Sequence, residues 1–135
     1  MAFVRSKTKT YKFPVTYVHP SATDPNKDDV FKFVGVFRRL SKSEMSDLYK
    51  KAKKDKDLNQ EQQLEKVEAM SLGEETLKFM AGWEEVTEED GTPIPFTKQS
   101  LDELFEEYPS LYVTLSQTFA DSQYESTRKK HRATV

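Results

Sequence analysis

Cysteine is absent from this chain of 135 residues, and histidine occurs twice, at His19 and His131. Without cysteine the chain has no disulfide framework, no thiol nucleophile and no cysteine-based zinc site. Apolar residues are also scarce, at 36% of the chain, while charged residues make up 33%. No apolar run approaches the roughly 18 residues that a membrane span needs, and the first residues lack the apolar segment of a signal peptide. We therefore expect a highly charged, soluble intracellular protein with a small core.

The features of common catalytic and metal sites are missing as well. The four glycines are scattered singly, so the chain has no glycine-rich phosphate loop. Residues 24–29 resemble the start of a calcium loop, but Asp29 and Gly35 occupy the places where that loop needs glycine and glutamate. Neither histidine lies beside a candidate nucleophile, and the acids of residues 84–90 favour a solvated face over an acid–base pair. We predict no enzymatic activity, no cofactor and no metal.

Charge is balanced overall, with a formal net charge of −2, but it is segregated along the chain. Residues 1–13 carry bases without acids, residues 84–90 carry acids without bases, and residues 128–132 are basic again. We expect a flexible basic arm at 1–10, a single domain at 11–125 and a flexible basic tail at 126–135. Such segregation also suits head-to-tail association between copies of the chain. Basic arms with aromatic residues can hold single-stranded nucleic acid, but the overall negative charge disfavours this.

Two segments alternate apolar and polar residues with the period of a β-strand. Residues 11–18 place on one face Tyr11, Phe13, Val15 and Tyr17. Residues 30–37 place on one face Phe31, Phe33, Gly35 and Phe37. A turn-rich segment separates the two, which predicts an antiparallel hairpin over residues 11–37. Pro14 cannot donate to a β-ladder, so the first strand should lie at a sheet edge or contain a bulge.

The rest of the domain, over residues 41–125, is predicted to be helical. Ser41 and Glu44 have the spacing of a capping box, in which each side chain bonds the other residue's backbone amide. Apolar residues at helical spacing follow the box, and a second such pattern runs over residues 64–70.

Three further helix starts are predicted. Ser71 either begins a new helix or precedes a kink at Gly73, and the apolar stripe continues from there to a helix end at Gly82. Thr97 is expected to cap one helix and Pro109 to begin another. The predicted fold is therefore α+β and mostly α, with an N-terminal antiparallel β-hairpin packed on four or five short helices.

Several motifs occur in a recognisable order. A predicted strand-to-helix junction contains Phe33, Gly35, Phe37, Arg38, Arg39, Leu40, Ser41 and Glu44. Further along come Gly82, Trp83 and Val86, then an acidic stretch, and then Asp90, Gly91, Pro93, Ile94, Pro95 and Phe96 before a capped helix. This series, over residues 10–125, resembles the tail assembly chaperones of long-tailed bacteriophages of the lambda-like type.

The resemblance implies a non-enzymatic function. Chaperones of this family bind the tape measure protein, keep that long helical chain soluble and recruit tail tube subunits around it. They act in the host cell cytoplasm, are absent from the mature virion and typically self-associate. Many also have a longer form made by ribosomal frameshifting, and the adjacent Lys129 and Lys130 are compatible with a slippery site.

The residues that we expect to bind a partner or to form a structural lock are Phe37, Arg38, Arg39, Trp83, Pro93, Pro95 and Phe96. The extended segment from Pro93 to Phe96 would fold back over Trp83 as a small apolar lock. Packing within the domain is favoured over direct partner contact for Trp83 and Phe96. Two other functions stay open: a small nucleic-acid-binding or regulatory protein that uses its basic arms, and a structural tail component that remains in the virion.

Overall fold

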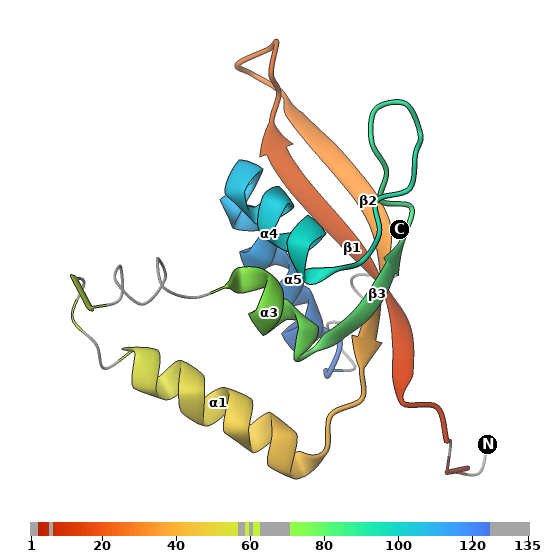
Figure 1. Ribbon diagram of the computed structural model, residues 1–135, viewed down its shortest axis with the longest axis vertical. Coiled ribbons are helices and arrows are strands. Elements are labelled where there is room, and N and C mark those ends of the chain that lie inside the picture. The colour runs from red at the N-terminus through yellow and green to blue at the C-terminus, as the bar shows by residue number, and fades with distance from the viewer. Residues whose placement is uncertain (1–2, 6, 57–58, 60, 63–70, 125–135) are drawn as a thin grey trace.

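The computed structural model describes residues 3–5, 7–56, 59, 61–62 and 71–124. Figure 1 shows the described elements, which are in chain order β1 (Thr10–Pro20), β2 (Asp28–Arg38), α1 (Lys42–Lys56), α3 (Leu72–Leu77), β3 (Met80–Glu84), α4 (Lys98–Glu107) and α5 (Pro109–Asp121). The apolar pattern at 64–70, the basic tail at 126–135 and the pair Lys129 and Lys130 lie outside the described residues.

Strands β1 and β2 form the antiparallel hairpin that the alternating pattern predicts. Directly opposite one another on the buried face are Tyr11 and Phe37, Phe13 and Gly35, and Val15 and Phe33. A shift of one residue would turn all of these side chains to the other face, so the burial of this face fixes the register. The first strand lies at an edge of the sheet, as Pro14 predicts, because its missing N–H would break the hydrogen-bond ladder of a central strand.

A third strand, β3, pairs antiparallel with β2 and completes a sheet of order β1-β2-β3. The predicted helix continuing to Gly82 is therefore wrong: α3 ends at Leu77, and a turn leads into β3. Pairing with β2 satisfies backbone groups that a lone hairpin would leave without partners. It also carries Met80, which has no exposed surface, into the core. Apolar spacing over so short a run does not distinguish a buried strand from the end of a helix.

The prediction of a mostly α fold is wrong for the same reason. Strands of 11, 11 and 5 residues stand beside helices of 15, 6, 10 and 13 residues in the described part of the chain. The fold is α+β, built on a three-stranded antiparallel sheet. The helix starts agree with the sequence: Ser71 caps α3 as a separate helix, Thr97 caps α4, and Pro109 occupies the first turn of α5.

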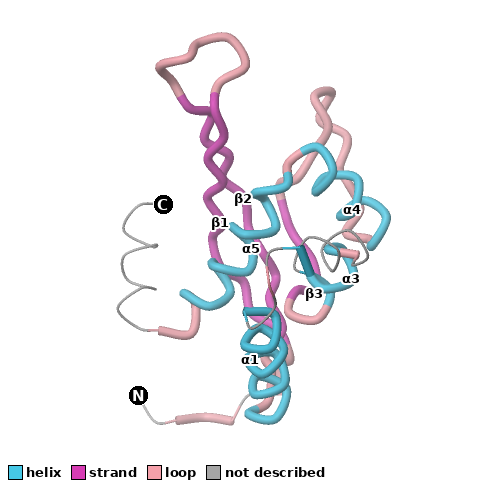
Figure 2. Tube along the Cα trace, turned by 90° about the vertical axis from the view of Figure 1, so that its left-hand side faces the viewer, coloured by secondary structure: helices cyan, strands magenta, loops and turns pink. Residues whose placement is uncertain are grey.

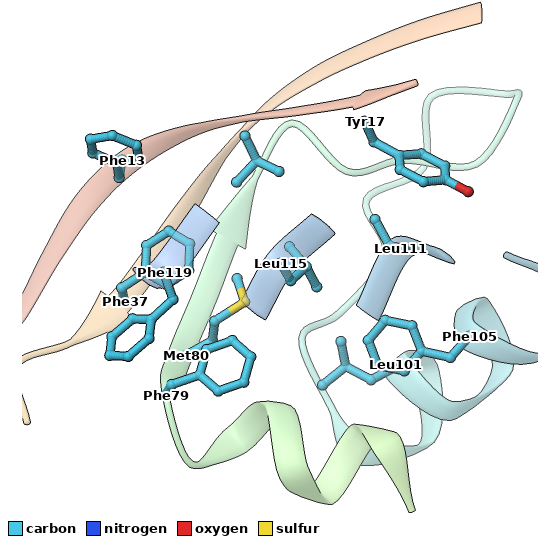
Figure 3. Close-up of a cluster of buried hydrophobic side chains, with 11 residues drawn as sticks. Phe13, Tyr17, Phe37, Phe79, Met80, Leu101, Phe105, Leu111, Leu115 and Phe119 are labelled. Atoms are coloured by element: carbon cyan, nitrogen blue, oxygen red, sulfur yellow. The ribbon is translucent and has the colours of Figure 1, made fainter. Parts of the chain in front are cut away.

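The core lies between the sheet and three helices. Helices α3, α4 and α5 lie on one side of the sheet in Figure 1, and α5 passes in front of the strands in Figure 2. The buried apolar side chains, drawn in Figure 3, are Phe13, Val15, Tyr17, Phe37, Phe79, Met80, Leu101, Phe105, Leu111, Leu115 and Phe119. Helix α1 lies apart from the other helices in Figure 1, and its half-buried Met45 and Leu48 contact this core.

Two tyrosine hydroxyls tie β1 to α5 at both ends of the helix. The Tyr17 hydroxyl lies 2.7 Å from Ser110 Oγ at the start of α5, and the Tyr11 hydroxyl lies 2.7 Å from Ser122 Oγ just after its end. Ser122 Oγ donates to the Phe119 carbonyl at 2.6 Å, so it accepts the hydrogen bond from the Tyr11 hydroxyl. Twelve helical residues span about 18 Å, and six strand residues span about 20 Å. Because Tyr17 bonds the start of α5 and Tyr11 bonds its end, the helix runs antiparallel to the strand, and the two spans have about the same length.

Candidate interaction surfaces

Phe37 belongs to the core. Its side chain has no exposed surface, and its ring lies 5.9 Å from the rings of both Tyr11 and Phe119. Gly35 makes room for this ring, because a Cβ at position 35 would come within 2.7 Å of Phe37 Cε2. The pair of residues thus fills the centre of the sheet face, and Phe37 has no surface to offer a partner.

Arg38 joins the end of β2 to the turn between α3 and β3. Its backbone amide donates to the Phe79 carbonyl at 2.9 Å, and its Nε donates to the Leu77 carbonyl at 2.9 Å and the Met80 carbonyl at 3.2 Å. The Leu77 carbonyl lies in the last turn of α3, where backbone acceptors need partners from outside the helix. Arg39 is exposed, and its amide donates to the Lys9 carbonyl at 2.8 Å.

The capping box after Arg39 is formed as predicted. The Ser41 amide donates to Glu44 Oε1 at 3.0 Å, and the Glu44 amide donates to Ser41 Oγ at 3.2 Å. The hydrogen bond from the Ser41 backbone lowers the pKa of Glu44, with a smaller contribution from the Ser41 hydroxyl. The junction motif therefore contains core, connecting and capping residues, each with a local structural role.

Trp83 and Phe96 pack together, as the lock prediction requires. Their ring centroids lie 5.0 Å apart at an interplanar angle of 82°, and Trp83 Nε1 donates to the Ile94 carbonyl at 2.9 Å. Trp83 lies inside β3, so its predicted place after a helix end is wrong. Both rings are partly buried, while Pro93 and Pro95 are exposed on the returning segment. A partner could reach this segment from outside the lock.

Asp102 is a connecting residue that the sequence analysis did not identify. From α4 it accepts hydrogen bonds from the Gly73 amide at 2.8 Å and the Ser71 hydroxyl at 3.0 Å, at the start of α3. Lys98 Nζ lies 3.4 Å from its other oxygen. Burial alone would raise the pKa of Asp102, but the bonds from Gly73 and Ser71, with Lys98 nearby, hold that pKa below its usual value. No local pattern reveals this contact, because its partners lie about thirty positions away and meet only in the fold.

Asp102→Asn is expected to lower the free energy of unfolding near neutral pH. The pKa of Asp102 is lower in the folded protein than its unfolded value of about 3.9. Its contribution is therefore present above that value and is lost as pH falls through the folded-state pKa. Urea unfolding of both proteins should show the largest difference at about pH 7, and the difference should shrink as the pH falls below about 3.9. Asp47→Asn, at an exposed position of α1, is the control; a difference for Asp102→Asn that does not change with pH would contradict the account.

One side of α1 carries a shallow hollow. Its volume is about 450 Å³, and its lining residues, at helical spacing along one face, are Lys42, Met45, Ser46, Tyr49 and Lys50. Tyr49 is 55% exposed and Met45 is half-buried. An apolar floor between two lysines fits an apolar partner segment that carries acidic residues. We call this surface the α1 hollow.

Other kinds of site find no support in the described part of the chain. Within residues 3–5, 7–56, 59, 61–62 and 71–124, no group of three or more histidine and acidic side chains could hold a metal ion. None of the described helices is long and apolar enough to cross a membrane. The described residues instead contain side chains that join neighbouring elements, such as Arg38 and Asp102, and several exposed apolar side chains.

The described residues form a small α+β protein on a three-stranded antiparallel sheet. The sequence model of the phage tail assembly chaperone family matches residues 1–131, and the chain belongs to this family. Comparison with curated proteins and with solved structures finds no significant match.

Proposed function

We propose that this chaperone binds the tape measure protein and recruits tail tube subunits to it during tail assembly, without catalysing a reaction. The observation that carries the proposal is the family match over residues 1–131. The chain would act in the host cell cytoplasm, self-associate and be absent from the mature virion. A longer form made by frameshifting near Lys129 and Lys130 belongs to the same proposal.

The α1 hollow is the surface that best suits the tape measure protein. It exposes Tyr49 beside the half-buried Met45, and Lys42 and Lys50 stand at its two ends. The tape measure protein of this family is a long helical chain, and an amphipathic helix can lay an apolar face into such a groove. Acidic residues beside that apolar face would meet the two lysines. None of the residues that line the hollow belongs to the buried core, and α1 lies apart from the other helices in Figure 1.

Tyr49→Asp is expected to weaken capture of the tape measure protein by about tenfold or more, because a central aromatic side chain contributes most at such contacts. The measurement is a pull-down of the tape measure protein from co-expressing cells with the tagged chain. Tyr124→Asp is the matched control, since Tyr124 is 60% exposed and lies outside the hollow. Equal capture by Tyr49→Asp and the unaltered chain would exclude the hollow as the binding surface. No capture by the unaltered chain would contradict the proposed function itself.

A further inference from the structure

Strand β3 is too short to cover the whole edge of β2. It pairs with β2 only from Val34 to Phe37, although β2 begins at Asp28. In the described part of the chain, no other strand lies on that side of β2. The side chains of residues 28–32 are all exposed. We call this side of residues 28–33 the open edge.

The backbone of Val30 points outward at the open edge. The Arg38 amide donates to the Phe79 carbonyl, which places the Arg38 backbone groups on the β3 side of β2. Residues two apart in a regular strand direct their backbone groups to the same side, and β2 pairs with β1 without a register shift. Val30 therefore presents its N–H and C=O away from β1, as Arg38 does. Outward backbone groups at an exposed edge are a template for another strand.

The chain itself turns away from the open edge after β3. Glu85 has a φ of 67°, outside the range of an extended strand. The loop that follows closes on itself, since the Ile94 amide donates to the Val86 carbonyl at 3.0 Å. In Figures 1 and 2 this loop and the β1–β2 hairpin diverge. The opposite edge of the sheet suits an added strand less well, because Pro14 in β1 has no N–H to offer it.

The first residues of the chain have the composition of a strand that fits this edge. Phe3 and Val4 are 96% and 78% exposed, and both residue types favour strands. Residues 3–9 carry three bases and no acid. The open edge is negative, because it carries Asp28 and Asp29 against a single lysine. Charge and composition therefore favour residues 3–9 as the occupant of the open edge.

Residues 3–9 of the same copy cannot reach the open edge. The Arg39 amide donates to the Lys9 carbonyl at 2.8 Å, which holds Lys9 beside the other end of β2. The nine residues from Arg39 to Val30 span about 30 Å of strand. The five residues from Lys9 to Val4 span at most about 18 Å. A segment of this sequence at the open edge must therefore come from a second copy.

We propose that residues 3–5 of a second copy add to the open edge as an antiparallel strand, in line with β3. This contact rests on the self-association that the proposed function includes, and it assigns the two surfaces involved. The register that matches the side chains pairs Phe3 with Phe31, Val4 with Val30, and Arg5 with Asp29. Val4 and Val30 then exchange both backbone hydrogen bonds. Opposed aromatic, β-branched and oppositely charged pairs each stabilise such a ladder.

The contact joins unlike surfaces, so association is head-to-tail. Each copy offers one basic segment and one open edge, and association continues until a ring closes. The segregated charge of the sequence fits this arrangement, because the basic and acidic residues that meet lie in different parts of the chain.

Val30→Pro is expected to weaken self-association by about tenfold or more, because it removes the outward N–H at the centre of the open edge. The hairpin should remain folded, since this N–H makes no bond to β1. Val18→Pro is the matched control: Val18 lies directly opposite Val30, is 50% exposed, and directs its N–H to the other edge of the sheet. Sedimentation of the full chain over a range of concentrations measures the association. Equal effects of the two substitutions, or no effect of Val30→Pro, would overturn the proposal.

Mixing two defective variants tests the head-to-tail contact. Phe3→Asp keeps the open edge but lacks the apolar segment, and it alters a side chain that is 96% exposed. Val30→Pro keeps the segment but lacks the edge. Each variant alone should associate weakly, whereas their mixture should form a one-to-one complex that does not grow further. A mixture that associates no better than either variant would overturn the proposal.

Charge exchange tests the register. Arg5→Asp and Asp29→Arg should each weaken association, and the double variant should recover most of the lost affinity. A double variant no better than the weaker single variant would contradict the pairing of Arg5 with Asp29. Tape measure capture by Val30→Pro should remain, so failure of this contact would leave the proposed function standing. Lost capture with unchanged self-association would show that the tape measure protein occupies the open edge and would overturn the proposal.

Discussion

Replacing Phe37 by alanine is expected to lower the free energy of unfolding by about 3–5 kcal/mol. The ring has no exposed surface, packs between Tyr11 and Phe119, and fills the space that Gly35 leaves open. Small domains are stable by only about 5–15 kcal/mol. The variant should therefore unfold at much lower urea concentration, and any loss of partner binding should follow from loss of the fold.

Phe31→Ala is the matched control for this prediction. Phe31 lies on the same face of β2, but its side chain is 46% exposed. The centroid of its ring lies 6.2 Å from that of the Tyr17 ring. Its removal should cost about 1 kcal/mol or less. Urea unfolding followed by circular dichroism measures both variants. A stable Phe37→Ala protein that fails to bind a partner would show that Phe37 acts at an interface instead of in the core.

Gly73→Ala is expected to destabilise the protein by about 1–3 kcal/mol, as overpacking of a close contact does. A Cβ at Gly73 would lie 2.7 Å from the Lys98 carbonyl and 2.7 Å from Asp102 Oδ1. The carbonyl belongs to the backbone, so α3 and the start of α4 must separate. That separation would also weaken the bond from the Gly73 amide to Asp102.

Gly82→Ala provides the comparison, because the nearest atom to its added Cβ is Val36 Cβ at 3.8 Å, an ordinary contact. This substitution should change the unfolding free energy by no more than about 0.5 kcal/mol. Thermal unfolding measures the stability of the two variants. Equal stability of Gly73→Ala and Gly82→Ala would show that α3 and α4 approach each other less closely than the structure describes.

The elements that could be predicted from the sequence are those with a local cause. Alternation in residues 11–18 and 30–37 predicted the hairpin and its buried face. The side chains of Ser41 and Thr97 predicted the helix starts that they cap. Strand β3 was missed because its pairing with β2 depends on residues far away in the chain, and its apolar spacing also fits a helix.

The candidate surfaces, likewise, could be predicted from the sequence only in part. The motif order suggested contact between Trp83 and Phe96, and the structure brings their rings together. The spacing of Met45 and Tyr49 marked one helix face, but whether the core covers it depends on where α1 lies relative to α3 and α5. Asp102 and the exposure of Val18 and Val30 likewise follow from tertiary packing. Interfaces depend on what the fold leaves uncovered, which local patterns do not contain.

Co-expression with the tape measure protein tests the central claim most directly. The tape measure protein is produced with and without this chain, and its soluble fraction and its association with the chain are measured. The account predicts that the tape measure protein aggregates alone and is recovered in a soluble complex when the chain is present. A tape measure protein that is equally soluble without the chain, or that does not associate with it, would contradict the proposed chaperone function.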